Sequence, residues 1–226
     1  MLKVSIMSEA FGKFISGISK ITPKMGSIIQ EQQQFIRDFL KENPSIKQIL
    51  ETGFHMGLGT ATMLDVRPDI SVLSFDIFWF EYTRRAKLLL DISYPERNVL
   101  IAGNSVCSIP SFLKQCPSYQ PDFVFIDGGH ERPVPYLDLH LILKHIKPGT
   151  YVMIDDYCEE HGAGGVMEAV NEFVKSNILV EAKGYKCYDR GWVMAKRSHL
   201  EVGPSALYEN KAEMQKVYED VESHYP

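Results

Sequence analysis

The chain has 226 residues, of which 45% are hydrophobic and 23% charged, and its formal net charge is −5. This length suits one α/β domain with additions and is short for two independent cores. No long basic run is present, which disfavours a large nucleic-acid interface. No stretch reaches the roughly 18 apolar residues that a membrane span requires.

Two amphipathic helices are predicted before the first strand. Residues 1–20 place apolar side chains near helical spacing, and Pro23 ends that pattern. Residues 28–40 follow an i, i+4, i+7, i+8 pattern, which ends at Pro44 because a residue before proline is pushed out of the helical region. We assign residues 1–44 to an N-terminal helical segment on the substrate side.

Strands and helices then alternate over residues 45–197, which we assign as the core domain. Strands are predicted at 47–51, 70–76, 98–102, 123–127 and 151–155, and helices at 60–66, 82–91, 111–115, 135–146 and 166–176. This alternation predicts an α/β fold with a doubly wound, mostly parallel, Rossmann-like sheet. Residues 179–187 and 191–196 flank a tight turn, which predicts a C-terminal antiparallel hairpin at the sheet edge.

The remaining sequence features favour a soluble cytoplasmic protein with no membrane partner. Its four cysteines form no C-x-x-C pair and have no zinc-like spacing, so we expect reduced thiols. Residues 1–20 lack the unbroken apolar core of a signal peptide. Residues 198–226 are polar and charged, with one more helix expected at 210–223. We interpret them as an appendage that could serve homodimer contacts.

A glycine-rich turn at residues 51–59 follows the first predicted strand. Gly53 and Gly57 would let the backbone turn sharply and approach a ligand, and the next helix N-terminus offers free N–H groups. The spacing is E-x-G-x-x-x-G-x-G, whereas a pyrophosphate-binding loop has G-x-G-x-x-G. From this motif alone, a turn without a ligand stays an open alternative.

Polar residues also end the next two strands. Asp76 is placed to accept hydrogen bonds from ribose hydroxyls, and Asn104 with Ser105 could meet an adenine edge. A solvated Asp76 and a simple turn at Asn104 are the alternatives. Three matched strand ends favour a nucleotide-like ligand.

Carboxylates end the fourth and fifth strands at Asp127, Asp155 and Asp156. If these strands are neighbours, the three groups converge, repel one another and raise their pKa values unless a cation neutralises them. Such oxygen ligands suit Mg²⁺, with Mn²⁺ or Ca²⁺ as alternatives. Asp155 and Asp156 could instead cap the following segment, and His130 could be a loop histidine bonded to the backbone.

Together these motifs resemble those of class I S-adenosylmethionine-dependent methyltransferases over residues 25–196. The resemblance implies that Glu51, Gly53 and Gly57 line the methionine part of the cofactor and that Asp127 also faces it. It further implies cofactor contacts by the following residues: Asp76 at the ribose, Asn104 and Ser105 near adenine, and Met25 closing the site.

The segments I-D-G-G-H at 126–130 and I-D-D-Y at 154–157 are similar to a divergent branch of metal-dependent O-methyltransferases. That branch includes macrolide-sugar and aminocoumarin-sugar enzymes and a relative linked to cephalosporin modification. The resemblance implies that Asp127, Asp155 and Asp156 hold Mg²⁺. It also implies catalytic roles for Asp127 and His130, with His130 as general base.

The sequence therefore predicts Mg²⁺-dependent O-methylation of a hydroxyl on a small molecule or sugar, with no nucleic-acid partner. Two hydroxyls chelated by Mg²⁺ would have lowered pKa values and an oxygen fixed in line with the methyl group. The competing interpretations are a nucleotide-binding oxidoreductase, another metal-dependent enzyme on this fold, and a non-catalytic cofactor-binding relative.

Overall fold

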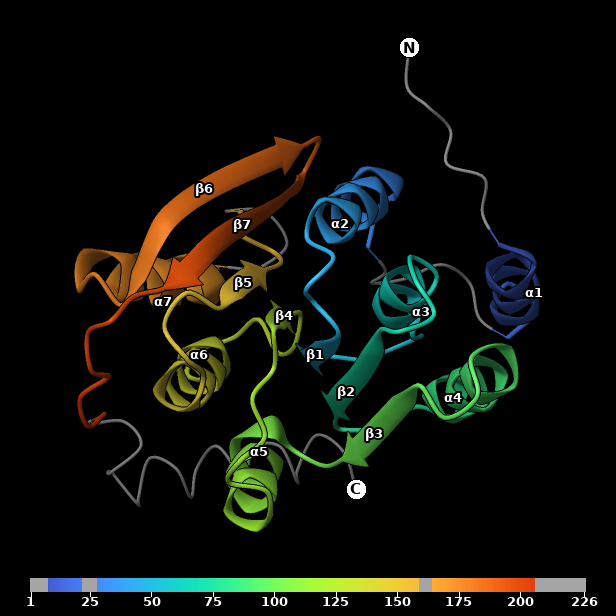
Figure 1. Cartoon of the computed structure of the whole chain (residues 1–226), viewed down its shortest axis with the longest axis horizontal. Helices are drawn as coiled ribbons and strands as arrows, with labels where there is room; N and C mark the ends of the chain where they lie inside the picture. Colours follow the sequence, from blue (N-terminus) through green and yellow to red (C-terminus); the bar gives the residue numbers. More distant parts are fainter. Residues whose placement is uncertain (1–7, 22–27, 159–163, 206–226) are drawn as a thin grey trace.

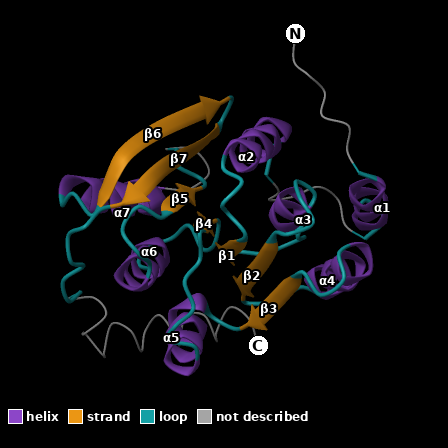
Figure 2. Cartoon of the chain, viewed as in Figure 1, coloured by secondary structure: helices purple, strands orange, loops and turns teal. Residues whose placement is uncertain are grey.

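The structure is a computed structural model that describes residues 8–21, 28–158 and 164–205. A seven-stranded mixed sheet forms its centre, with helices on both faces (Figures 1 and 2). The strand order is β3-β2-β1-β4-β5-β7-β6. The predicted α/β Rossmann-like sheet is confirmed, and so is the antiparallel hairpin, which β6 and β7 form.

The elements have the following bounds. The strands are β1 (Gln48–Thr52), β2 (Ser71–Asp76), β3 (Asn98–Ala102), β4 (Phe123–Ile126), β5 (Tyr151–Ile154), β6 (Leu179–Cys187) and β7 (Arg190–Arg197). The helices are α1 (Glu9–Ile18), α2 (Gln30–Glu42), α3 (Leu58–Leu64), α4 (Glu81–Ser93), α5 (Ser105–Gln115), α6 (Val134–His145) and α7 (Gly164–Lys175). Within the described ranges, no helix is long and apolar enough to cross a membrane.

The core has two layers because successive residues of a buried strand point to opposite faces of the sheet. In β4, Phe123 and Phe125 pack on the face covered by α1 to α4, whereas Val124 and Ile126 pack on the face covered by α5 to α7. All four side chains are almost fully buried. This two-sided burial explains the unbroken apolar runs of the central strands.

The main difference from prediction is the start of α5. The prediction began this helix at residue 111, after Pro110, but the helix begins at Ser105. The side-chain oxygen of Asn104 accepts a hydrogen bond from the Val106 amide at 3.1 Å and caps the N-terminus. The cap lets the helix form despite Pro110 in its interior. Met25 and the helix expected at 210–223 lie outside the described residues.

The register of the central strands brings their carboxyl ends level. Thr52 pairs with Ile126, which pairs with Ile154. The backbone ladder continues one residue further, because the Asp127 amide donates to the Thr52 carbonyl and the Asp155 amide to the Ile126 carbonyl, both at 2.9 Å. Residues that follow β1, β4 and β5 are therefore neighbours at one sheet edge.

Candidate functional site

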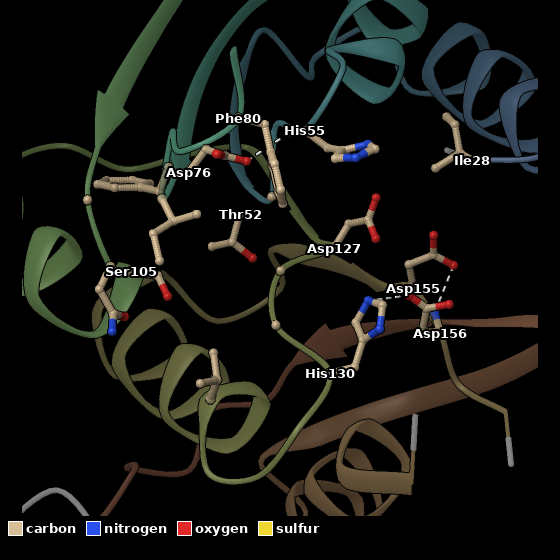
Figure 3. A pocket seen from close by; sticks show the side chains of 18 of the residues that line it. Ile28, Thr52, His55, Asp76, Phe80, Ser105, Asp127, His130, Asp155 and Asp156 are labelled. Atoms are coloured by element: carbon tan, nitrogen blue, oxygen red, sulfur yellow. Dashed lines mark hydrogen bonds and ion pairs between the residues drawn. The ribbon is translucent and has the colours of Figure 1, made fainter. Parts of the chain in front are cut away.

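A cavity of about 420 Å³ opens at this edge (Figure 3). Segments that follow β1 to β5 form most of its wall, and Ile28 before α2 and Arg190 of β7 complete it. Of the predicted site residues, it is lined by Gly53, Asp76, Asn104, Ser105, Asp127, His130, Asp155 and Asp156. Glu51 and Gly57 do not line this cavity.

The two predicted glycines are required by backbone geometry. Gly53 has φ +85°, and a Cβ there would lie 1.7 Å from the carbonyl oxygen of Asp127. Gly57 has φ +71° at the N-cap of α3, where a Cβ would lie 2.6 Å from the Phe54 ring. The turn after β1 therefore packs directly on the segment after β4, which a residue with a side chain could not do.

Glu51 is buried beneath that turn. Its carboxyl group accepts hydrogen bonds from the hydroxyls of Thr60 and Ser74. Burial raises the pKa of Glu51 to about 7, against the opposing effect of these two bonds. In this position Glu51 links Thr60 of α3 to Ser74 of β2.

Asp76 presents its carboxylate to the cavity at the end of β2. The backbone amide of His55 donates to Oδ2 at 2.8 Å, and the amide of Phe78 donates to Oδ1 at 2.6 Å. These bonds fix the carboxylate and leave each oxygen a further lone pair. Such a carboxylate can accept hydrogen bonds from a ligand diol.

His55 is a cavity residue that the sequence prediction did not include. Its Nε2 atom lies 2.9 Å from the Tyr82 hydroxyl, and burial lowers its pKa, which favours the neutral imidazole. Phe80, which also lines the cavity, stacks on Tyr82 with ring centroids 4.8 Å apart. The position of His55 inside the glycine-rich turn was the available sequence signal.

Asp127, His130 and Asp156 form a tight group of ligating side chains. One ligand atom from each lies within 4.8 Å of the others. Asp155 is adjacent but differently engaged, since its Oδ1 atom accepts from the buried side-chain amide of Gln32 and, at 2.8 Å, from the Asp156 backbone amide. The predicted acidic residues thus meet at one place, with His130 nearer than Asp155 to the centre of the group.

Two basic side chains flank Asp156. Nε2 of His130 lies 2.7 Å from its Oδ2 atom, and a guanidinium nitrogen of Arg190 lies 3.1 Å from Oδ1. Although burial opposes the shift, these partners lower the pKa of Asp156, and the hydrogen bond to Asp156 raises the pKa of His130. Asp156 also has φ +54°, a conformation uncommon outside glycine and found often at functional sites.

The pKa of Asp127 is shifted in the opposite direction to that of Asp156. Burial and then the charges of Asp155, Asp156 and Glu51 raise its pKa well above the ordinary value. Convergent carboxylates of this kind favour binding of a proton or a cation. The site can therefore take up positive charge at Asp127.

In comparison with known proteins, residues 50–157 are similar to the family described as a methyltransferase domain. A curated relative, an uncharacterized protein of Acanthamoeba polyphaga mimivirus, is 34% identical over 67 residues. That segment covers 30% of this chain and only 29% of the length of the relative.

Solved structures share the fold over most of its length. The O-methyltransferase of tomaymycin synthesis from Streptomyces achromogenes, solved with S-adenosylmethionine, has a TM-score of 0.70 and 16% identity, covering 87% of this chain and 92% of its own. An O-methyltransferase from Bacillus cereus, solved with S-adenosylhomocysteine, has a TM-score of 0.67 and 14% identity, covering 87% and 94%. A candidate O-methyltransferase from Klebsiella pneumoniae has a TM-score of 0.71 and 19% identity, covering 87% and 92%.

Proposed function

We propose that this chain, whose residues 50–157 match a methyltransferase domain, is an S-adenosylmethionine-dependent O-methyltransferase. Its acceptor is a hydroxyl of a small molecule or sugar. The observation that carries the proposal is the single cavity shared by Gly53, Asp76 and the Asp127–His130–Asp156 group. Cofactor-binding and proton-accepting groups thereby face the same space.

The residues present fit the cofactor. The cavity volume is within the range of about 300–1,000 Å³ usual for small-molecule sites. Gly53 leaves room that a Cβ would fill, and Asp76 offers a fixed acceptor for a ribose diol. When bound, the cofactor supplies an electrophilic methyl group on a sulfonium centre. The remaining task of the protein is to align and deprotonate the acceptor.

The residues present also fit a divalent cation. Asp127 and Asp156 would be its principal ligands, with Asp155 completing the protein set. The convergence of carboxylates that raises the pKa of Asp127 supports this assignment. Mg²⁺, or alternatively Mn²⁺ or Ca²⁺, would lower the pKa of an acceptor hydroxyl.

His130 is the proposed general base. Its Nε2 atom lies beside the acidic group, where its N–H donates to the Asp156 carboxylate. In this role the imidazole must turn from Asp156 to the acceptor hydroxyl. His130 and the cation therefore compete for the Asp156 carboxylate. When the cation binds Asp156, the His130 imidazole is released.

A metal-independent transferase is the second candidate, because Arg190 and His130 already neutralise Asp156. Activity in EDTA separates the two. The metal-dependent proposal expects loss of turnover in EDTA and its return on addition of Mg²⁺.

The test begins with calorimetric titration of S-adenosylhomocysteine, with and without Mg²⁺. Methyl transfer is then measured across acceptors that carry vicinal diols, including sugars and catechols. Binding of S-adenosylhomocysteine and methylation of at least one diol are expected. A folded protein that does not bind S-adenosylhomocysteine contradicts the proposed function.

A further inference from the structure

Gln32 is a buried side chain of α2 to which the proposed function gives no role. Its relative exposure is 1%. Its side-chain oxygen accepts a hydrogen bond from the Ile29 backbone amide at 3.0 Å, and its side-chain nitrogen donates to Oδ1 of Asp155. A backbone N–H can only donate, so the amide oxygen must face Ile29 and the NH₂ group must face Asp155. Both ends of this side-chain amide are therefore bonded, and its orientation is fixed.

Asp155 receives two hydrogen bonds on the same oxygen. Besides Gln32, the Asp156 backbone amide donates to Oδ1 at 2.8 Å. The Asp155 carboxyl group is buried in the wall of the cavity. Within the described part of the chain, both donors use Oδ1, which leaves Oδ2 as the oxygen that can face a cation.

Asp155 needs such support because it stands beside the tight group of Asp127, His130 and Asp156 and not within it. A carboxylate that binds a cation loses rotational freedom, and this loss weakens binding unless another bond already holds the side chain. Hydrogen-bond partners behind a ligating side chain commonly raise metal affinity by about 10- to 100-fold. The side-chain amide of Gln32 is in the right place to act in this way.

The same side-chain amide also fixes one wall of the cavity. Ile28, which precedes the bonded Ile29 amide, lines the cavity, and its carbonyl oxygen accepts from the Gln33 side chain at 3.2 Å. Figure 3 shows Ile28 and the Asp155–Asp156 pair at the same end of the cavity. One side chain thus joins the start of α2 to the proposed cation site.

We propose that Gln32 is a positioning residue that holds the Asp155 carboxylate with its Oδ2 atom toward the cation. The inference rests on the proposed function. Gln32 orients a ligand and does not itself touch the cation. Methionine is unbranched and of similar length, so it can fill the same space without donating a hydrogen bond. In Gln32→Met the cation affinity falls, because the binding energy must then also order the Asp155 side chain.

The experiment is a calorimetric titration of Mg²⁺ into wild-type protein, Gln32→Met, Asp155→Asn and the double variant. Gln32→Met should weaken Mg²⁺ binding by about tenfold, the scale for loss of an outer hydrogen-bond partner. In the Asp155→Asn background, the same substitution should change the affinity by less than about twofold, because the ligand that Gln32 orients is gone. Gln34→Met is the matched control on α2, since the Gln34 amide bonds only to exposed Asp38, and should keep the wild-type affinity.

The two backgrounds separate a role through Asp155 from a general effect on structure. Unchanged Mg²⁺ affinity in Gln32→Met overturns the inference, and so does an equal loss in both backgrounds. If Gln32→Met does not fold, NMR of wild-type protein decides. The side-chain amide signals of Gln32 should shift on addition of Mg²⁺ while those of Gln34 do not, and unshifted Gln32 signals at saturating Mg²⁺ overturn the inference.

Binding of S-adenosylhomocysteine distinguishes this inference from the proposed function. Gln32→Met should bind S-adenosylhomocysteine within about threefold of wild type, because the amide acts on the cation site alone. Folded wild-type protein that binds S-adenosylhomocysteine but not Mg²⁺ overturns the cation site and this inference with it. Folded wild-type protein that binds neither contradicts the proposed function as a whole.

Discussion

Nε2 of His130 lies 2.7 Å from Oδ2 of Asp156, so the proposed general base is hydrogen-bonded to a proposed metal ligand. This contact raises the pKa of His130 and, with Arg190, lowers that of Asp156. The pair is thus charged over a wider pH range than either residue would be alone. Metal binding, protonation and thermal stability are expected to be linked at this site.

The His130 contact predicts a pH-dependent contribution to stability. Because the folded-state pKa is raised, the stabilisation is fully present below the unfolded pKa of about 6.5. It is lost as the pH rises through the folded value. In EDTA, the difference in melting temperature between wild type and His130→Gln should be largest in mild acid and should close in alkali. Exposed His199→Gln serves as the control, and a pH-independent difference for His130→Gln would refute the linkage.

Replacing the proposed metal ligands should separate cation binding from cofactor binding. Asp127→Asn and Asp156→Asn should weaken Mg²⁺ binding by about tenfold or more and abolish turnover. Binding of S-adenosylhomocysteine should change by less than about threefold, under 0.7 kcal/mol. Calorimetry measures both ligands, and Asp91→Asn, in the Lys87–Asp91 ion pair of α4, is the control. Wild-type-like Mg²⁺ binding in both variants would remove these residues from the site.

Asp127→Asn has a second expected effect in EDTA. The raised pKa shows that the carboxylate is unfavourable in its surroundings, so a neutral amide should increase the melting temperature at neutral pH. Asp156→Asn should lower it, because Arg190 and His130 lose their charged partner. The distinguishing result is that the two substitutions shift the melting temperature in opposite directions. Equal shifts in one direction would contradict the charge balance described here.

Gly53→Ala should disrupt the site more severely than backbone strain alone can explain. Its Cβ would lie 1.7 Å from the Asp127 carbonyl, and we expect a loss of about 3 kcal/mol or more in unfolding free energy. Gly149→Ala is the matched control, since Gly149 has φ +86° but no atom within 4 Å of its Cβ position. That control should lose about 1 kcal/mol. Denaturant unfolding measures both, and equal losses would argue against the close approach.

Glu51→Gln tests the buried carboxyl group behind the turn. The folded pKa of about 7 exceeds the unfolded value of about 4.5, so wild-type protein loses stability as the pH rises through this window. The glutamine variant lacks this loss. Its stability relative to wild type should increase between pH 4 and 8, by up to about 3 kcal/mol at 1.36 kcal/mol for each pKa unit. A difference that is independent of pH would show that folding does not raise the pKa of Glu51.

The sequence allowed prediction of the sheet and of the strand ends because both depend on local patterns. Apolar runs located β4 and β5 to within one residue, and the glycine spacing located the turn after β1. The partners of the acidic group could not be predicted in this way. Gln32 reaches Asp155 from a helix 123 positions away in sequence, and Arg190 reaches Asp156 from the hairpin. Such contacts depend on how α2 and β7 pack on the sheet, which periodicity does not encode.

Asp138 shows the same limit within a single helix. Asp138 lies within the apolar pattern of α6. From the sequence alone, a polar residue on the buried face of a helix gives no indication of what it does. Only the three-dimensional structure shows that Asp138 is buried and that its Oδ2 atom lies close to Gly128. Buried acids without charged partners are therefore recognised by their neighbours and not by spacing.

Because the carboxyl ends of the central strands are level, we expect insertions in the strands to be tolerated less well than insertions in the helices. One added residue within β4 would rotate Asp127 to the opposite face and break its alignment with Gly53 and Asp155. An added turn at the C-terminal end of α4, by contrast, leaves the alignment of the strand ends unchanged. The number of residues between the strand pairing and each site side chain is therefore constrained, whereas the length of α4 is not. When distant relatives are aligned, we expect this number of residues to be a better guide than the identity of any core side chain.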